Sequence, residues 1–122
     1  MKFAKWTFIL AGVYGLLLLT PMLFLEQRLS QDSPPPITHP EYFYGFLLVT
    51  LAWQVSFLVI GMDPVRYRPL MLLAGLLEKF PYSLAVITLF ALGRVSQVVL
   101  GLGVVDLVLG ALFVAAYFRS KQ

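Results

Sequence analysis

The chain has 122 residues, of which 60% are hydrophobic and 12% are charged, and its mean hydropathy is +0.86. Soluble domains contain roughly 45–50% apolar and about 25% charged residues, so this composition excludes a soluble globular protein and indicates a membrane protein. The formal net charge of +3 needs no nucleic-acid partner, since membrane topology accounts for the basic residues. The lack of cysteine excludes disulfides and Cys-ligated metal sites.

Four apolar runs can each cross a bilayer, whose core of about 30 Å needs about 20 residues of helix. They cover approximately residues 6–25, 42–62, 69–93 and 98–118. The first run follows Lys2 and Lys5 as a secretory signal would, but it is too long and no small-residue cleavage site follows it. We therefore interpret it as a retained helix. The sequence predicts an all-α protein with a single transmembrane domain, residues 1–122, and little chain remains for a soluble catalytic domain.

The connections between these runs indicate how the chain crosses the membrane. Residues 26–41 are rich in proline, which favours extended backbone, and we expect an outer loop there. Residues 93–97, GRVSQ, are so few that the last two helices must be antiparallel neighbours. Basic residues concentrate on the other side: Lys2, Lys5, Arg66, Arg68, Arg119 and Lys121, against Arg28 and Arg94 on the outer side. By the positive-inside rule, this predicts an antiparallel four-helix bundle in the inner (plasma) membrane with both termini cytoplasmic.

Arg66 and Arg68 lie in the cytoplasmic connection GMDPVRYRPL, residues 61–70. Such residues lie among phospholipid headgroups, where they anchor the topology. Specific binding of a lipid headgroup is the alternative. Membrane lipids are therefore the first expected partners of the protein.

Polar residues interrupt the last three runs at one depth. With a rise of 1.5 Å per residue, Gln54, Glu78 and Asp106 lie about 12, 13 and 18 Å from the cytoplasmic ends of their helices. All three are thus expected near the bilayer midplane. Small residues share their helix faces, which is typical of faces that pack against another helix. We therefore expect these side chains to face protein.

An ionisable group near the midplane costs at least about 2.5–3.5 kcal/mol on insertion scales, so Glu78, Lys79 and Asp106 need an explanation. Lys79 is about 100° from Glu78 around the helix and is expected to be a poor partner for it. Lys79 then either reaches Asp106 on the next helix or extends toward an interface. Pro81 cannot donate to the carbonyl of Leu77 and is expected to kink the helix beside Glu78.

Two interpretations of this cluster stay open. Its polar groups can be structural, specifying which helices pair, or they can line a functional pocket. Trp53 lies next to Gln54 in the sequence, and this tryptophan is a candidate wall of a pocket for a hydrophobic ligand, together with Tyr14, Phe57, Phe80 and Tyr82. Ordinary helix packing and interfacial anchoring explain such aromatics equally well.

The four-helix plan, with the Arg-containing turn DPVRYRPLM followed by LLEKF, resembles small bacterial integral membrane proteins and, loosely, the DoxX-like group. That group is distantly similar to the four-helix proteins of the sterol-isomerase and sigma-2-receptor type. In the isomerase-like members, buried carboxylates and an aromatic wall surround a sterol or an amine-bearing ligand. The resemblance implies analogous places for Glu78, Asp106 and Trp53. The buried histidine of those isomerases has no counterpart, because His39 lies in the outer loop.

Three functions are compatible with the sequence. The first is a module that binds a lipid or another hydrophobic ligand, or an accessory subunit of a membrane complex, with other membrane subunits or a second copy as partners. The second is a small proton-coupled transporter with Glu78 as the proton carrier. The third is a membrane-embedded enzyme, for which acid–base isomerisation by Glu78 and Asp106 is the only chemistry left, because no nucleophile–base pair is present. Non-enzymatic binding, without a cofactor or metal, is our expectation.

Overall fold

The computed structural model describes residues 2–32 and 37–120, and all elements in these ranges are helical. Four segments are long and apolar enough to cross a membrane, as expected of a multi-pass membrane protein. At 23 or 24 residues each, they are about 35 Å long, which exceeds the hydrocarbon core of about 30 Å. They are Lys2–Phe24, Pro40–Met62, Arg68–Ala91 and Gln97–Arg119.

The first span combines the α-helix α1 (Lys2–Leu19) with the 3₁₀ turn η1 (Pro21–Phe24). It starts four residues before the predicted run, because the helix continues past Trp6 to include Lys5 and Lys2. The α-helical part ends before Pro21, which cannot donate a backbone hydrogen bond to the preceding turn. The tighter 3₁₀ geometry tolerates proline in its first turn.

The outer loop expected at 26–41 is in part helical, which the sequence did not indicate. Its first part forms the short helix α2 (Glu26–Asp32), and the second span, α3, begins at Pro40. Arg28 and Asp32, one helical turn apart, form an ion pair at 3.3 Å, a spacing that supports a short helix. Residues 33–36 of the expected loop, and Lys121 among the basic residues used for orientation, lie outside the described residues.

The third span has three parts: α4 (Arg68–Leu73), the π-helical turn η2 (Ala74–Lys79) and α5 (Phe80–Ala91). The expected irregularity beside Glu78 is thus a π turn that ends where α5 begins. Pro81 lies in the first turn of α5, directly after the π turn, and it has no backbone N–H to donate to that turn. A Schellman motif ends α5: the Gly93 amide donates to the Phe90 carbonyl and the Arg94 amide to the Leu89 carbonyl.

Gly93 has φ of +73°, a left-handed conformation that glycine adopts without steric cost. The chain then enters the last helix, α6 (Gln97–Arg119), where the hydroxyl of Ser96 accepts a hydrogen bond from the Val99 amide at 3.3 Å. This side-chain cap satisfies one of the amides that a helix start leaves without a partner.

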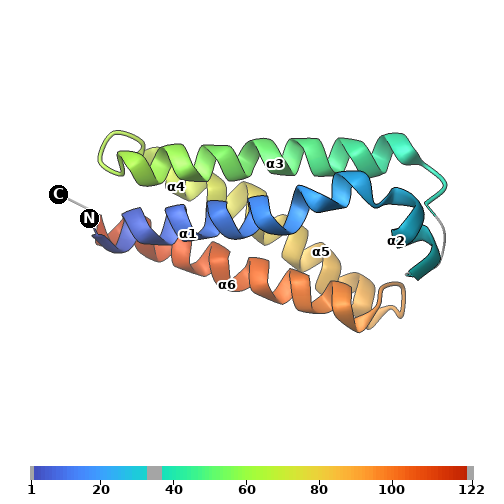
Figure 1. Ribbon diagram of the computed structural model, residues 1–122. Helices are drawn as coiled ribbons and strands as arrows, with labels where there is room; N and C mark the ends of the chain where they lie inside the picture. The colour runs from blue at the N-terminus through green and yellow to red at the C-terminus, as the bar shows by residue number, and fades with distance from the viewer. Residues whose placement is uncertain (1, 33–36, 121–122) are drawn as a thin grey trace.

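Figure 1 shows α1 and α3 side by side along most of their length, with α6 and the third span beside them. The start of α1, the 63–67 connection and the end of α6 lie at one end of the molecule. The short helix α2 and the connection after α5 lie at the other end (Figure 1). Below, these are called the Lys2 end and the α2 end.

Three phenylalanines in mutual contact form the centre of the core near the Lys2 end. Phe8 of α1 lies parallel to Phe113 of α6 with ring centroids 4.1 Å apart, and Phe57 of α3 meets Phe113 edge-on at 4.9 Å. All three side chains are fully buried, and such aromatic pairs contribute beyond their buried area. The rings therefore join three of the four spans.

Glycines bring the backbones close where the spans cross. A Cβ on Gly12 of α1 would lie 2.8 Å from the Gln54 carbonyl of α3, and one on Gly61 of α3 would lie 2.7 Å from Ile9. On α6, a Cβ on Gly103 would lie 2.7 Å from Val86 of α5. Small residues at such crossings increase dispersion contact, which holds helices together in lipid.

Candidate functional site

A charged cluster connects the third span to α6. Lys79 is the last residue of η2, and its Nζ donates a hydrogen bond to Asp106 Oδ1 at 3.2 Å. The same Nζ lies 3.4 Å from Glu78 Oε2. Lys79 is only 3% exposed, and the side chains of Glu78 and Asp106 are 10% and 20% exposed. The acids thus face protein, as expected, and one lysine is shared between two carboxylates.

Lys79 was expected either to reach Asp106 or to extend toward an interface. In the structure it contacts Asp106. The expectation that Lys79 is a poor partner for Glu78 is wrong in part. The flexible lysine chain brings its ammonium group within ion-pair distance, although Glu78 Oε2 accepts no hydrogen bond within the part of the chain that the structure describes. Lys79 therefore has one hydrogen-bonded carboxylate and one that it contacts by charge alone.

Local packing fixes the lysine in this position. A Cβ on Gly110 of α6 would lie only 3.0 Å from Lys79 Cβ and 2.7 Å from the Phe80 ring, so the glycine lets α6 approach the π turn. The ammonium group also lies 5.2 Å from the centre of the Phe57 ring, within cation–π range. Ser83 Oγ donates to the Lys79 carbonyl at 2.9 Å, which satisfies a backbone acceptor beside the cluster.

A partly enclosed cavity of about 190 Å³ lies next to this pair, and its wall extends toward the α2 end as far as Met22. Lys79 and Asp106 form its charged part, with Gln54 and the side chains of Tyr14 and Tyr82. The rest of the wall consists of small or apolar residues and one threonine from α1, η1, α3 and α6: Gly15, Leu18, Leu19, Met22, Phe46, Thr50, Val99 and Leu102. An apolar cavity of about 150 Å³ can hold benzene, so this space admits a group of at least ring size.

Gln54 lines the cavity but does not join the ion pairs. It is 1% exposed, and its Nε2 donates to the carbonyl of Thr50 in its own helix at 2.9 Å. Its Oε1 lies where a Cβ on Gly15 of α1 would be, so the absence of a side chain at Gly15 creates the space for the amide. The sequence predicts Gln54 in the polar cluster. In the structure, its amide group lines the cavity and donates its hydrogen bond to the backbone of its own helix.

Four predicted pocket residues are not part of the cavity wall: Trp53, Phe57, Phe80 and Glu78. Trp53 packs against the phenylalanine core, with its ring 6.2 Å from that of Phe57. It faces that way because one step along α3 from Gln54 turns the side chain by about 100°. Glu78 contacts the cavity only through Lys79. Of the other expected aromatics, Tyr14 and Tyr82 do line the cavity.

Sequence reasoning missed several wall residues that helical periodicity can find. The missed Val99 and Leu102 precede Asp106 by seven and four residues, just as Tyr82, which was predicted, follows Lys79 by three. Such spacings place side chains on one helix face. Starting from the two charged residues and stepping toward the α2 end therefore recovers part of the wall. Met22 cannot be found this way, because it lies on the 3₁₀ turn after Pro21.

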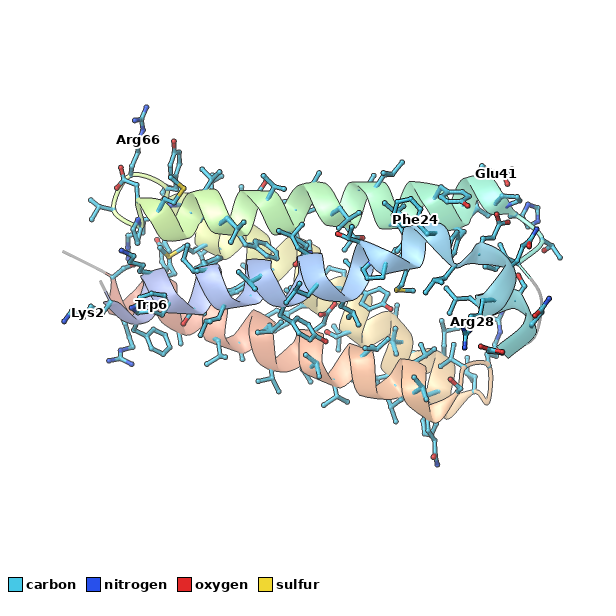
Figure 2. The ribbon with its side chains drawn as sticks, viewed as in Figure 1. Lys2, Trp6, Phe24, Arg28, Glu41 and Arg66 are labelled. Carbon is cyan, nitrogen blue, oxygen red and sulfur yellow. The ribbon has the colours of Figure 1, made fainter. Side chains whose placement is uncertain are left out.

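The two arginines of the 61–70 connection differ in their surroundings. Arg68 Nε donates to the Tyr117 carbonyl at 3.1 Å, and its guanidinium lies 3.9 Å from the centre of the Tyr117 ring. Arg68 thereby ties the start of α4 to the end of α6. Arg66 is exposed at the Lys2 end, as Figure 2 shows. Arg66 is thus the better placed of the two for lipid headgroups.

No group of three or more metal-ligating side chains that could hold a metal ion occurs within residues 2–32 and 37–120. Comparisons with protein-family models, with curated proteins and with solved structures found no match. Similarity to the DoxX-like group therefore stays a prediction, and the function is argued from the geometry alone.

Proposed function

We propose that the protein is an antiparallel four-span protein with both termini cytoplasmic that binds a small, mainly apolar molecule with one polar end. The charge distribution supports the orientation. Lys2 and Arg66 lie at one end of the molecule, and Arg28 and Glu41 lie at the other (Figure 2). The Lys2 end is thus the more basic one, and it faces the cytoplasm by the positive-inside rule.

The observation that carries the binding proposal is the cavity of about 190 Å³ beside the Lys79–Asp106 pair. Ligand sites are typically concave and apolar with a few convergent polar groups, and this wall has that composition. Asp106, Tyr82 and Gln54 provide carboxylate, hydroxyl and amide groups for the polar end of a ligand. The leucines and Met22 toward the α2 end contact its apolar part.

The cavity lies within the spans, so its ligand is expected to partition into the bilayer. Lipid-like molecules and other hydrophobic compounds with a hydroxyl or amide group fit this description. A purely polar solute does not, because it leaves most of the wall without compensating hydrogen bonds. No covalent chemistry is required, and the site residues act by shape and hydrogen bonding.

Native mass spectrometry of protein extracted in mild detergent tests this proposal. The parent protein is expected to carry a non-covalent adduct of lipid-like mass. Leu102→Trp fills the cavity and is expected to carry one adduct fewer than the parent protein, whereas Val108→Trp, on the exposed side of α6, is expected to carry as many as the parent. A parent protein without an adduct, or equal adducts on both variants, contradicts ligand binding in this cavity.

The charge count favours a second candidate, a proton pathway. Lys79 supplies one positive charge for two carboxylates, and a bound proton would balance the other in a medium of low dielectric constant. Reconstituted vesicles separate the two functions, because a pathway requires proton flux that Glu78→Gln reduces. Equal flux for parent and variant removes this candidate and leaves ligand binding unaffected.

A further inference from the structure

A second hollow lies on the outside of the bundle, between α1 and α6. It measures about 680 Å³ and is open along one side. Its wall is almost entirely apolar: Lys2, Phe3, Trp6, Thr7, Leu10, Ala11, Tyr14, Val105, Leu109 and Leu112. Trp6 is 53% and Leu10 61% exposed, so this groove faces the surroundings of the bundle. In a membrane, those surroundings are acyl chains.

The groove has a basic mouth at the Lys2 end. There it meets a smaller hollow of about 320 Å³, which shares Lys2 and Phe3 and adds Ala4, Arg119 and Ser120. The Arg119 guanidinium lies 4.3 Å from the centre of the Phe3 ring, a cation–π contact that holds it over the mouth. Within the described residues, neither hollow is lined by an acidic side chain.

The length of the groove matches one leaflet. Lys2 and Tyr14 are twelve residues apart on a continuous helix, or about 18 Å. Half of the hydrocarbon core is about 15 Å. An acyl chain whose headgroup lies at Lys2 therefore reaches approximately to Tyr14, where the groove ends.

We propose that this groove is a binding site for one anionic phospholipid, with its phosphate between Lys2 and Arg119 and one acyl chain along α1 and α6. Two basic side chains at an apolar groove match a phosphate with an attached chain in both charge and shape. A second copy of the protein in the same orientation is a poorer occupant, because it brings its own basic end against Lys2 and Arg119. The groove shares only Tyr14 with the cavity, and the lipid site does not depend on the function proposed for the cavity.

Trp6 offers a direct readout, because it lines the groove and the chain has only two tryptophans. In a Trp53→Phe background, Trp6 is the single tryptophan. The protein is reconstituted in phosphatidylcholine bilayers containing either brominated phosphatidylglycerol or brominated phosphatidylcholine at equal mole fraction. Bromine quenches a tryptophan that it contacts, so the ratio of the two quenching curves gives the preference for the anionic lipid.

One basic residue near a membrane raises the binding constant for an anionic lipid by about fivefold. The parent protein is therefore expected to prefer phosphatidylglycerol to phosphatidylcholine severalfold. Lys2→Gln/Arg119→Gln is expected to bring the ratio close to one. Lys2→Arg/Arg119→Lys keeps both charges and is expected to keep the preference. Lys5→Gln/Arg66→Gln is the matched control, since it removes two charges from the same end, Lys5 in the first turns of α1 and Arg66 as Figure 2 shows, and neither residue lines the groove. Lys5 Nζ lies 5.8 Å from the centre of the Trp6 ring, and the ratio of the two quenching curves cancels a change in Trp6 emission that both lipids share.

Three results would overturn the proposal. A parent protein without lipid preference excludes an anionic site. An equal loss in the Lys2/Arg119 variant and in the control shows diffuse attraction to the basic end and no discrete site. Weak quenching by both lipids that increases as the protein is diluted in lipid shows that a second copy occupies the groove.

Discussion

Replacing Lys79 by methionine tests whether the charged cluster holds the third span against α6. Lys79 is 3% exposed, and its ammonium group is 3.2 Å from Asp106 and 3.4 Å from Glu78. Methionine keeps most of the side-chain volume but leaves two carboxylates without their cation. Removing one partner of a buried ion pair costs about 3–5 kcal/mol, and we expect Lys79→Met to lower the free energy of unfolding by that amount.

Charge-matched variants separate this effect from lost packing. Asp106→Asn retains a hydrogen-bond acceptor for Lys79 and leaves the lysine paired with Glu78, so its expected cost is only about 1–2 kcal/mol. The triple variant Lys79→Met/Glu78→Gln/Asp106→Asn has no charge in the cluster and is expected to be more stable than Lys79→Met alone. Replacing a complete buried ion pair by neutral groups is often nearly neutral in stability.

The assay is reversible unfolding in mixed micelles with increasing sodium dodecyl sulfate, followed by circular dichroism. If Lys79→Met lowers the free energy of unfolding by less than about 1 kcal/mol, the lysine does not stabilise the two carboxylates. That result would contradict the large cost expected for breaking a buried ion pair. A triple variant less stable than Lys79→Met would show that the three groups stabilise the fold separately. Either result contradicts the interpretation of the cluster as one coupled unit.

Three further predictions use the same assay. Gly110→Ala is expected to lower the free energy of unfolding by about 1–3 kcal/mol through overpacking, because the new Cβ would lie 2.7 Å from a ring carbon of Phe80 in α5. The control Gly101→Ala, on the same helix, meets no atom within 4 Å and is expected to cost nothing. Equal effects of the two variants would contradict the close approach of α6 to α5. Phe113→Ala removes a fully buried ring and is expected to lower the free energy of unfolding by about 3–5 kcal/mol. The control Phe118→Ala removes a ring that is 62% exposed and is expected to cost much less. A similar loss for both variants would contradict the place of Phe113 in the core. Gly93→Ala forces a side chain into φ of +73° and is expected to cost about 1 kcal/mol, and an unchanged unfolding midpoint contradicts this.

The number of spans and their approximate positions followed from the sequence, because a bilayer imposes a minimum apolar length that few other structures require. Membrane association was predicted for the same reason, and the structure has four helices that are long and apolar enough to span a membrane, which is consistent with that prediction. The helix α2 was missed. Its residues are polar and close to a proline-rich stretch, and the local ion pair between Arg28 and Asp32 is too weak a pattern to predict a helix alone.

The facing of the charged residues was predicted from the small residues that share their helix faces, and the structure places Glu78 and Asp106 against protein. The separation of Trp53 from the cavity was not predicted, although adjacent residues on a helix point about 100° apart. Proximity in the sequence to Gln54 was the wrong criterion. The wall residue Met22 was also missed, because its position depends on the 3₁₀ turn that follows α1.

The π turn η2 adds a consequence for the alignment of side chains along the third span. A π turn accommodates one residue more than α-helical geometry does, so it offsets the phase between α4 and α5. Met71 and Val86, on opposite sides of the turn, are both buried. Converting the 74–79 segment to regular α-helix with all its residues kept would rotate one half of the span by about 100° relative to the other, whereas deleting one residue at the same time would leave the two halves aligned. The wide turn thus acts as a spacer that sets the rotational registry of the whole span.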